Sequence, residues 1–347
     1  MAPMKFPEPD LFSPGRGEPS LRWGVLGPGS IASAFVDALR SHTRQRPFAV
    51  ASRNPERADA FARTWGLQRA YDSYEALVED PEVDIVYVAT PHSEHLANGL
   101  LALRAGKHVL IEKPIAMRAD DARLLVREAR ERGRFLMEAM WSRYLPHTSV
   151  LRKLLADGAI GDVRHVFADL SQLGPSDPAH RLHKPELGGG ALLDLGVYTV
   201  QLSSMILGAP TAIAANGALT DAGVDAFSTV VLAHGRHAQS TLISSIVARS
   251  SSTAYVTGTG GRIDLGGSFH NPTTLCLAGN DYASEPSVWK DPTGIEGYGG
   301  LAWQATAAAR YIGEGRTESP LHPLDEVIRI MATLDAARAQ LGAGSGD

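Results

Sequence analysis

The sequence has very little cysteine and no long basic segment. Its 347 residues include a single cysteine, Cys276, and carry a formal net charge of -5. One thiol excludes a disulfide within the chain and leaves too few thiolates for a cysteine-based zinc site, and the twelve histidines are scattered without metal-ligand spacing. We therefore expect no bound metal, a reducing cytoplasmic location, and no nucleic acid as partner.

Long hydrophobic runs are also scarce. The most apolar stretch, residues 191–215, is interrupted by Asp194 and Gln201, which favours a buried helix over a membrane span. The first twenty residues are rich in proline and glycine and contain no apolar run that could form a signal-peptide core. We interpret residues 1–20 as a loose extension and expect no membrane partner.

The pattern of predicted elements changes near residue 143. Before it, short apolar strand candidates alternate with helices, which is typical of a doubly wound parallel sheet. From residue 163 onward the strand candidates are consecutive and alternating, which indicates a mostly antiparallel sheet. The predicted fold is therefore α/β, with a Rossmann domain at residues 21–143 followed by an α+β domain with a mostly antiparallel open sheet at residues 144–347.

A glycine-rich turn joins the first predicted strand, residues 21–26, to the first predicted helix, residues 31–39. Small residues let the backbone approach a pyrophosphate, and the helix N-terminus offers free amides and a positive dipole end. A plain turn is the alternative, but the position between strand and helix favours dinucleotide binding. The candidate cofactor residues are Gly27, Pro28, Gly29, Ser30 and Ile31.

The second predicted strand, residues 48–51, ends in Ser52, Arg53 and Asn54, with no acidic residue to hold the ribose hydroxyls of NAD. Arg53 could instead pair with a 2'-phosphate, helped by Ser52 and Arg57. A solvated loop arginine is the alternative. We expect NADP in preference to NAD.

Polar residues follow three further predicted strands. Because ligands bind beyond the carboxyl ends of the strands in an open parallel sheet, these residues are candidates for a nicotinamide pocket. Lys113 alone could equally be a surface lysine at a strand end, and His95 is better explained by structural hydrogen bonds in the first turn of its helix. The candidates are Thr90, Pro91, His92, His95, Glu112, Lys113, Trp141 and Arg143.

The glycines at 188–190 precede an apolar helix that carries Asp194 and Tyr198. A spacing of four places these two side chains on one face of a helix. These two side chains either form a hydrogen bond with each other or face a polar ligand together.

These motifs together resemble the family of glucose-fructose oxidoreductase, inositol dehydrogenase and the rhizopine-catabolism protein MocA, over nearly the whole chain. The resemblance depends on Gly27-x-Gly29-x-x-Ala32, on Thr90-Pro91 with His95, on Glu112-Lys113-Pro114, and on three glycines followed by Asp194. The segments MEAMWSRYLP and GGGALLDLGVYTV are most similar to dimeric dihydrodiol dehydrogenases and NADP-dependent D-xylose dehydrogenases.

The resemblance implies that Lys113 and Tyr198 form the proton-transfer apparatus and that Asp194 binds a substrate hydroxyl or holds Lys113. Many members have histidine in place of Tyr198 and aspartate in place of Gln201, so a histidine mechanism of the inositol type is doubtful here. The resemblance also implies a cis peptide before Pro114 and a homodimer, or a dimer of dimers, formed through the C-terminal sheet.

The expected activity is NADP(H)-dependent hydride transfer at a hydroxyl or carbonyl carbon of a sugar, a trans-dihydrodiol or a related polyol. Tyr198 would transfer the proton while Lys113 favours its ionised form, although the reverse assignment fits nearly as well. One alternative is reduction of a keto group on a nucleotide-linked sugar. The other is a non-catalytic NADP-binding sensor or co-repressor. The presence of Lys113, Asp194 and Tyr198 together argues against this alternative.

Overall fold

The computed structural model of the protein describes residues 6–281 and 285–343. The chain forms two compact units. The parallel-sheet unit consists of Leu11–Tyr144 and Glu296–Ile328. The mixed-sheet unit consists of Met1–Asp10, Leu145–Ile295 and Arg329–Asp347.

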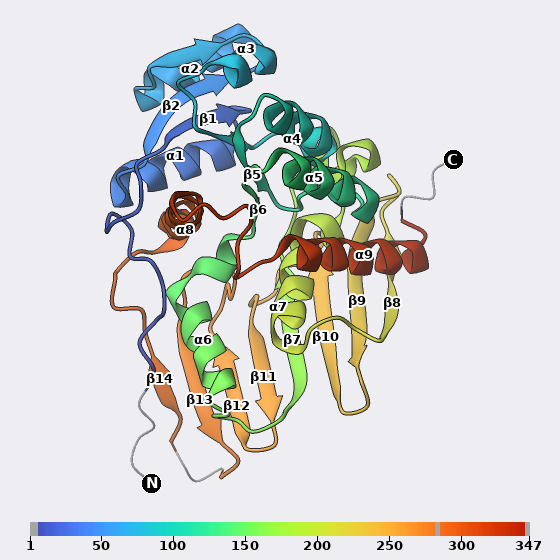
Figure 1. Ribbon diagram of the computed structural model, residues 1–347. Coiled ribbons are helices and arrows are strands. Elements are labelled where there is room, and N and C mark those ends of the chain that lie inside the picture. The colour runs from blue at the N-terminus through green and yellow to red at the C-terminus, as the bar shows by residue number, and fades with distance from the viewer. Residues whose placement is uncertain (1–5, 282–284, 344–347) are drawn as a thin grey trace. The chain divides into compact units, whose positions relative to one another are not determined.

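The parallel-sheet unit contains a six-stranded sheet with the order β3-β2-β1-β4-β5-β6, in which every pairing is parallel. The strand order reverses between β1 and β4, the position where a doubly wound sheet opens a crevice for ligands. Helices α4 and α5 pack together on one face, and α1 and α8 pack together on the other (Figure 1). The elements are β1 (Arg22–Leu26), α1 (Ser30–His42), β2 (Arg46–Ala51), α2 (Pro55–Trp65), β3 (Arg69–Tyr71), α3 (Tyr74–Glu79), β4 (Ile85–Val88), α4 (His95–Arg104), β5 (His108–Glu112), α5 (Ala119–Arg132), β6 (Leu136–Ala139) and α8 (Leu301–Gly313).

Local sequence explains where these elements begin and end. All residues of β4, Ile85–Val88, are buried, as expected for a central strand that is covered on both faces. At the start of α2 the side chain of Asn54 accepts a hydrogen bond from the Arg57 amide, and a proline occupies the first helical position. Helix α2 ends at Gly66, whose φ of 61° is left-handed.

The mixed-sheet unit contains an eight-stranded sheet with the order β14-β13-β12-β11-β7-β10-β9-β8. Only the β7–β10 pairing is parallel. Helices α6 and α7 lie against one face of the sheet (Figure 1). The elements are α6 (Pro146–Ala156), β7 (Val163–Ser171), α7 (Val197–Leu207), β8 (Ala212–Leu219), β9 (Asp225–His234), β10 (Ala238–Ser245), β11 (Ala254–Gly258), β12 (Gly261–Leu265), β13 (Leu275–Gly279), β14 (Ser287–Trp289) and, across the unit boundary, α9 (Leu324–Leu341). The predicted α/β fold, with a parallel and then a mostly antiparallel sheet, is confirmed.

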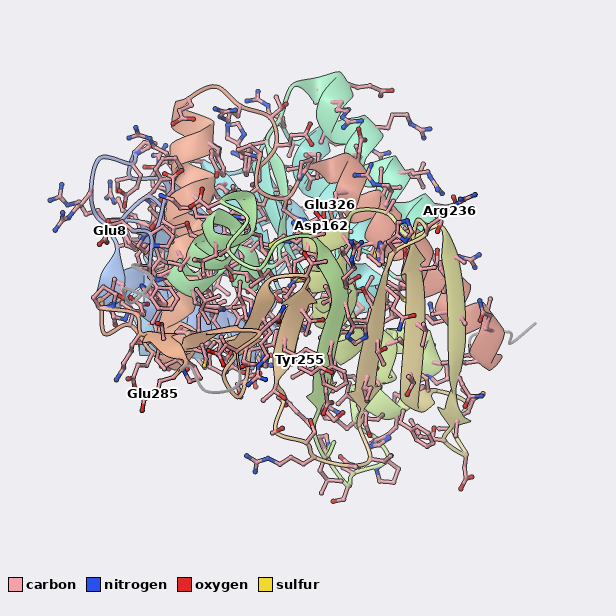
Figure 2. The ribbon with its side chains drawn as sticks, turned by 90° about the horizontal axis from the view of Figure 1, so that it is seen from below. Glu8, Asp162, Arg236, Tyr255, Glu285 and Glu326 are labelled. Carbon is pink, nitrogen blue, oxygen red and sulfur yellow. The ribbon has the colours of Figure 1, made fainter. Side chains whose placement is uncertain are left out.

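The other face of this sheet is partly exposed. Buried and more exposed residues alternate along β7 and β9, as in a sheet with one covered face. On the exposed face Phe167 stacks on Tyr255, with ring centroids 4.9 Å apart and planes at 12° (Figure 2, where Tyr255 is labelled). Phe227 and Val231 of β9 are 46% and 37% exposed.

The edge strand β8 is protected by α9. The side-chain amide of Gln340 accepts a hydrogen bond from the Ala215 amide at 2.8 Å and donates one to the Ile213 carbonyl at 3.1 Å. These contacts satisfy backbone groups that an edge strand would otherwise present to another chain.

Two segments differ from the domain boundaries that the sequence suggests. Residues 296–328 belong to the parallel-sheet unit, because α8, whose many alanines are buried, packs on α1. Residues 6–20 are not loose: the Phe12 ring packs edge-on against Tyr311 at 5.6 Å between centroids, and the Asp10 amide donates to Ser149 at 2.8 Å. Residues 1–5 of the predicted extension and residues 344–347 of the predicted second domain lie outside the described residues.

The stretch Pro185–Leu207 is long and apolar enough to cross a bilayer by composition alone. However, 78% of its most apolar window is buried, as expected for a core helix.

Candidate functional site

The glycine turn opens directly onto the N-terminus of α1. Gly27 has a φ of 92°, and a Cβ atom there would lie 2.9 Å from the Ala89 carbonyl oxygen. Nothing lies within 4 Å of a Cβ built on Gly29. The first turn of α1 has no acidic residue and no side-chain cap, so its amides and dipole are available to an anion. This geometry fits a dinucleotide pyrophosphate.

Arg53 follows the end of β2, and Arg57 lies in the first turn of α2. The Arg53 side chain is 69% exposed and pairs with Glu94 at 3.4 Å. Burial raises the pKa of Tyr74, and a hydrogen bond and positive charge from Arg53, with the charge of Arg57, oppose that rise. Ser52 is buried, and its hydroxyl accepts the Asn54 amide at 3.2 Å, so it shapes the turn. An exposed cation pair beside a phenol fits a phosphate group.

His95 is held entirely within the parallel-sheet unit. Its ring nitrogens lie 2.8 Å from the Pro114 carbonyl oxygen and 2.9 Å from the Thr90 carbonyl oxygen. Burial lowers the pKa of His95 to about 4, and the hydrogen bonds to the Pro114 and Thr90 carbonyls oppose that fall. The ring thereby ties the end of β4 to the residue after Lys113. His92 is buried edge-on against it, with centroids 5.6 Å apart.

The backbone around Lys113 is held by two buried carboxylates. Glu112 accepts hydrogen bonds from the Tyr87 hydroxyl and from the Lys113 amide. Burial raises the pKa of Glu112, and the Tyr87 hydrogen bond and the Lys113 charge oppose that rise. The Lys113–Pro114 bond is cis, as the resemblance implies, and the Lys113 side chain is half-buried.

The second carboxylate, Glu138, joins this loop to a distant segment of the same unit. One of its oxygens accepts the Ile115 amide at 2.8 Å, and the other lies 2.8 Å from Nε2 of His322. Both side chains of the Glu138–His322 pair are fully buried. Burial lowers the pKa of His322, more strongly than the neighbouring carboxylate raises it. The pair anchors the peptide two positions after Lys113.

Trp141 and Arg143, at the end of β6, are both buried. The Arg143 guanidinium is 2% exposed and donates to Glu326 at 2.7 Å and to the Leu321 carbonyl at 3.2 Å. The Trp141 ring lies 6.0 Å from the Tyr298 ring. These contacts hold residues 298–326 against β6.

In the mixed-sheet unit two of the three glycines are required by the close approach of neighbouring atoms. A Cβ on Gly189 would lie 2.6 Å from the Leu182 carbonyl oxygen, and one on Gly190, whose φ is 104°, would overlap the Asp225 carboxylate. Asp225 is 1% exposed and accepts the Leu192 amide at 2.6 Å. Burial raises the pKa of Asp225 to about 6, against the hydrogen bonds from Leu192 and Ala191 and the charge of Arg338. Asp225 therefore caps the helix that follows the glycines.

That helix begins with a π-helical segment, Leu192–Gly196, before α7. The sequence predicts a regular α-helix here, whereas the observed helix has a wider, π-helical turn at Asp194. Such π-helical turns are frequent at functional sites. Asp194 pairs with Arg181 at 3.0 Å. The Tyr198 ring is 6% exposed and packs against His270, with centroids 4.8 Å apart and planes at 46°.

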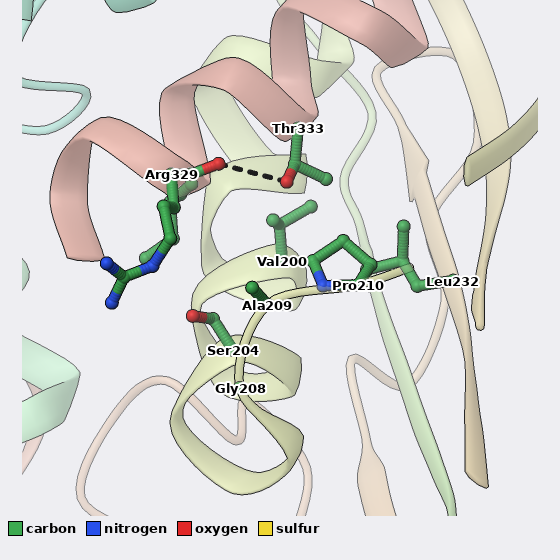
Figure 3. A pocket seen from close by; sticks show the side chains of 9 residues that line it. Val200, Ser204, Gly208, Ala209, Pro210, Leu232, Arg329 and Thr333 are labelled. Carbon is green, nitrogen blue, oxygen red and sulfur yellow. Dashed lines mark hydrogen bonds between the residues drawn. The ribbon is translucent and has the colours of Figure 1, made fainter. Parts of the chain in front are cut away.

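A small pocket lies elsewhere in this unit (Figure 3). It is lined by Val200 and Ser204 of α7, the following loop, Leu232, and Arg329, Ile330 and Thr333 of α9. Positions 200 and 204 are about 200° and 240° around an α-helix from position 198. The pocket is therefore on the other side of α7 from Tyr198.

The predicted cofactor residues of the parallel-sheet unit meet at one edge of its sheet, because β1, β2, β4, β5 and β6 are parallel neighbours. Asp194 and Tyr198 share the helix that Asp225 caps. Sequence reasoning missed several residues that hold these groups. Glu138 in an apolar strand and Asp225 at a strand start were visible as isolated buried acids, whereas Arg181, His270 and His322 lie in irregular segments that carry no such signal.

Two protein-family models match the chain. The one described as "Oxidoreductase family, NAD-binding Rossmann fold" matches residues 21–140, and the "GFO/IDH/MocA C-terminal domain" matches residues 148–264. The chain is 37% identical over 329 residues to trans-1,2-dihydrobenzene-1,2-diol dehydrogenase of Bos taurus and 38% identical over 330 residues to that of Mus musculus. Each comparison covers 93% of this chain and 97% of the relative.

Among solved structures, the fold is similar to that of KijD10, a 3-ketoreductase from Actinomadura kijaniata in complex with NADP and TDP-benzene. The TM-score is 0.81 and the sequence identity 28%, over 93% of this chain and 98% of the other.

We predict that Gly190→Ala destabilises the protein by at least about 2 kcal/mol, because it combines a left-handed backbone with overlap of the Asp225 carboxylate. The measurement is equilibrium unfolding in denaturant. Gly208→Ala is the matched control, since its φ of 74° is also left-handed but a Cβ there has no neighbour within 4 Å. Equal losses in the two variants would show that the Asp225 contact does not matter.

Proposed function

Because the chain belongs to the glucose-fructose oxidoreductase, inositol dehydrogenase and MocA family, we propose that it is an NADP(H)-dependent dehydrogenase that oxidises trans-dihydrodiols or sugars through Tyr198 and Lys113. The observation that carries this proposal is the unblocked N-terminus of α1 behind the glycine turn, at the same sheet edge as Lys113. The family and the relatives establish that the protein is an NAD(P)-linked oxidoreductase that acts on CH–OH groups.

A nicotinamide cofactor supplies the hydride acceptor or donor when it is bound. The protein must then hold the substrate and move one proton. In oxidation, the phenol oxygen of Tyr198 takes the proton of the substrate hydroxyl, and the ammonium of Lys113 favours the ionised phenol and orients the hydroxyl. Lysine as the proton carrier with tyrosine as its partner remains the second assignment. In this proposal Asp194, which pairs with Arg181 at 3.0 Å, binds a substrate hydroxyl or holds Lys113.

Rigidity at Lys113 supports this role. Its own amide, the Pro114 carbonyl and the Ile115 amide each make a hydrogen bond to a buried side chain, those of Glu112, His95 and Glu138. Three successive residues held by buried groups leave the backbone little freedom. A reacting group gains most from such fixed placement.

Reduction of a keto group on a nucleotide-linked sugar is the second candidate. It is favoured by the similarity to the 3-ketoreductase, a structure that holds TDP-benzene. The 37% identity to diol dehydrogenases favours the first. Assays with trans-1,2-dihydrobenzene-1,2-diol plus NADP⁺, and with keto sugars linked to a nucleotide plus NADPH, separate the two through the absorbance of reduced nicotinamide.

We predict that Lys113→Met and Tyr198→Phe each lower kcat at least about a hundredfold, because each removes a group required for proton transfer. The dissociation constant of NADPH, measured by fluorescence, should change less than threefold. Lys153→Met, in which the lost ammonium donates to the Glu8 carbonyl, should keep full activity. Full activity in either site variant would exclude the mechanism.

The preference for NADP rests on Arg53 and Arg57 near Tyr74, with no acidic residue directly after β2. We predict that Arg53→Ala weakens NADPH binding about tenfold, the value of one charge-assisted hydrogen bond to a phosphate, and leaves NADH binding within twofold. Titrations with both cofactors test this, and Arg63→Ala, an exposed arginine of α2, is the control. Equal weakening for NADH and NADPH would contradict a 2'-phosphate contact.

The exposed face of the mixed sheet supports a homodimer, or a dimer of dimers, formed through that sheet. Phe227 and Val231 are exposed there opposite Ala218 and Ala214 of β8, so this part of the face is apolar. We predict that the double variant Phe227→Lys with Val231→Lys is monomeric by light scattering, while the wild type is at least dimeric. A wild-type monomer at micromolar concentration would refute this interface.

A further inference from the structure

Glu94, a residue that the sequence did not single out as functional, forms an ion pair with Arg53. Nη1 of Arg53 and Oε1 of Glu94 are 3.4 Å apart. We propose that Glu94 sets the choice between NADP and NAD, because its carboxylate faces the 2'-position of the adenosine ribose, where it accepts the hydroxyl of NAD and repels the phosphate of NADP. This inference rests on the proposed function and adds to it a residue that determines cofactor specificity.

The topology of the parallel sheet places this ion pair at the ligand-binding edge. Arg53 follows β2, and Glu94 ends the short helical turn His92–Glu94, which follows β4. Strand β1 lies between β2 and β4, and the glycine turn at Gly27 follows it. The Arg53–Glu94 contact therefore joins the carboxyl ends of the two strands on either side of β1. This is the position at which a doubly wound sheet binds a dinucleotide.

The backbone of Glu94 is fixed by its neighbours. The Glu94 amide donates to the Pro91 carbonyl at 2.9 Å. The next residue, His95, is fully buried, and its ring nitrogens lie 2.8 Å and 2.9 Å from the carbonyl oxygens of Pro114 and Thr90. The Glu94 side chain, by contrast, is 32% exposed. The carboxylate is thus attached to a rigid part of the chain and is accessible to a ligand.

Charges of both signs surround one phenol at this edge. Burial raises the pKa of Tyr74, the charges of Arg53 and Arg57 oppose that rise, and the charge of Glu94 adds to it. All three charged side chains are therefore close enough to Tyr74 to act on its ionisation. A 2'-phosphate that is bound by Arg53 and Arg57 must lie within the field of the Glu94 carboxylate.

The ion pair does not prevent a phosphate from binding to Arg53. The Arg53 side chain is 69% exposed, and ion pairs at such exposure contribute little free energy. A doubly charged phosphate makes charge-assisted hydrogen bonds to a guanidinium, so it replaces the carboxylate at Arg53. The carboxylate of Glu94 then remains near the phosphate and repels it, which weakens the binding of NADP.

The same carboxylate has the opposite effect on NAD. An ionised carboxylate only accepts hydrogen bonds, and a ribose hydroxyl donates one. Sheets of this type that select NAD place an acidic residue after the second strand for this contact. In this chain Ser52, Arg53 and Asn54 occupy that position, and the acidic residue comes instead from the turn after β4. Glu94 therefore lets the protein bind NAD in spite of Arg53.

The test measures the dissociation constants of NADPH and NADH for Glu94→Gln, which keeps the shape of the side chain and removes its charge. We expect NADPH to bind about fivefold more tightly and NADH about fivefold more weakly, so that the ratio of the two constants changes at least about tenfold. Fluorescence titrations at low ionic strength give both values.

Glu82→Gln is the matched control. It removes the same charge and an ion pair, in which Glu82 lies 3.5 Å from Arg22. Glu82 precedes β4 and therefore lies at the opposite edge of the sheet from Glu94. Both dissociation constants should stay within about twofold of the wild-type values, because exposed charges that far apart are screened.

Two ligands without nicotinamide locate the effect at the ribose. The nucleotide 2',5'-ADP carries the 2'-phosphate, and 5'-ADP carries the free hydroxyl, so Glu94→Gln should tighten the binding of the first and weaken that of the second. Calorimetry gives these values independently of any turnover. In about 0.5 M NaCl the gain for 2',5'-ADP should fall below about twofold, because salt screens charges at an exposed site.

An unchanged ratio of the NADPH and NADH constants in Glu94→Gln overturns this role, and so does a gain for 2',5'-ADP that persists in high salt. Arg53→Ala separates that failure from a failure of the proposed function. If Arg53→Ala leaves NADPH binding unchanged, the 2'-phosphate contact itself is wrong. If Arg53→Ala weakens NADPH binding while Glu94→Gln changes nothing, only the role of Glu94 is wrong.

Discussion

The parallel-sheet unit depends on a buried carboxylate, Glu138, that accepts a backbone amide with one oxygen and faces His322 with the other. Removing one partner of a buried charged pair costs about 3–5 kcal/mol because the remaining group is left without compensation. The same carboxylate fixes the peptide two positions after Lys113. The stability of the fold and the geometry of the site therefore both depend on Glu138. His95 holds the adjacent carbonyl, which makes the loop rigid on both sides of Pro114.

In the mixed-sheet unit a buried carboxylate, that of Asp225, has an equivalent structural role. Asp225 caps the helical segment that carries Asp194 and Tyr198, and the absence of a side chain at Gly190 makes room for it. The pKa of Asp225 lies near 6, below neutral pH, so the carboxylate is mostly ionised at pH 7 and remains a strong acceptor for the amides at the helix start. In both units an internal acid therefore sets the position of a proposed proton-transfer residue.

The sequence predicted the fold well where chemistry is local. The glycine turn and the strand and helix on either side of it are determined by a few neighbouring residues, and the predicted ranges 21–26 and 31–39 lie close to the observed Arg22–Leu26 and Ser30–His42. The sequence could not place residues 296–328 in the parallel-sheet unit, because an alanine-rich helix gives no signal of its partner. Nor could it predict the π-helical turn at Asp194, whose first amide, that of Leu192, donates to Asp225 far along the chain.

The discontinuity of the parallel-sheet unit has a consequence for synthesis. The Leu136 amide donates to the Thr317 carbonyl at 3.0 Å, and Arg143 pairs with Glu326, so the last strand of the first sheet is completed by residues that are synthesised much later than the strand itself. Contacts across such sequence separations slow folding, since the loop must close before they form. On the ribosome, the first strands of the protein must therefore wait for residues 296–328 before their unit is complete.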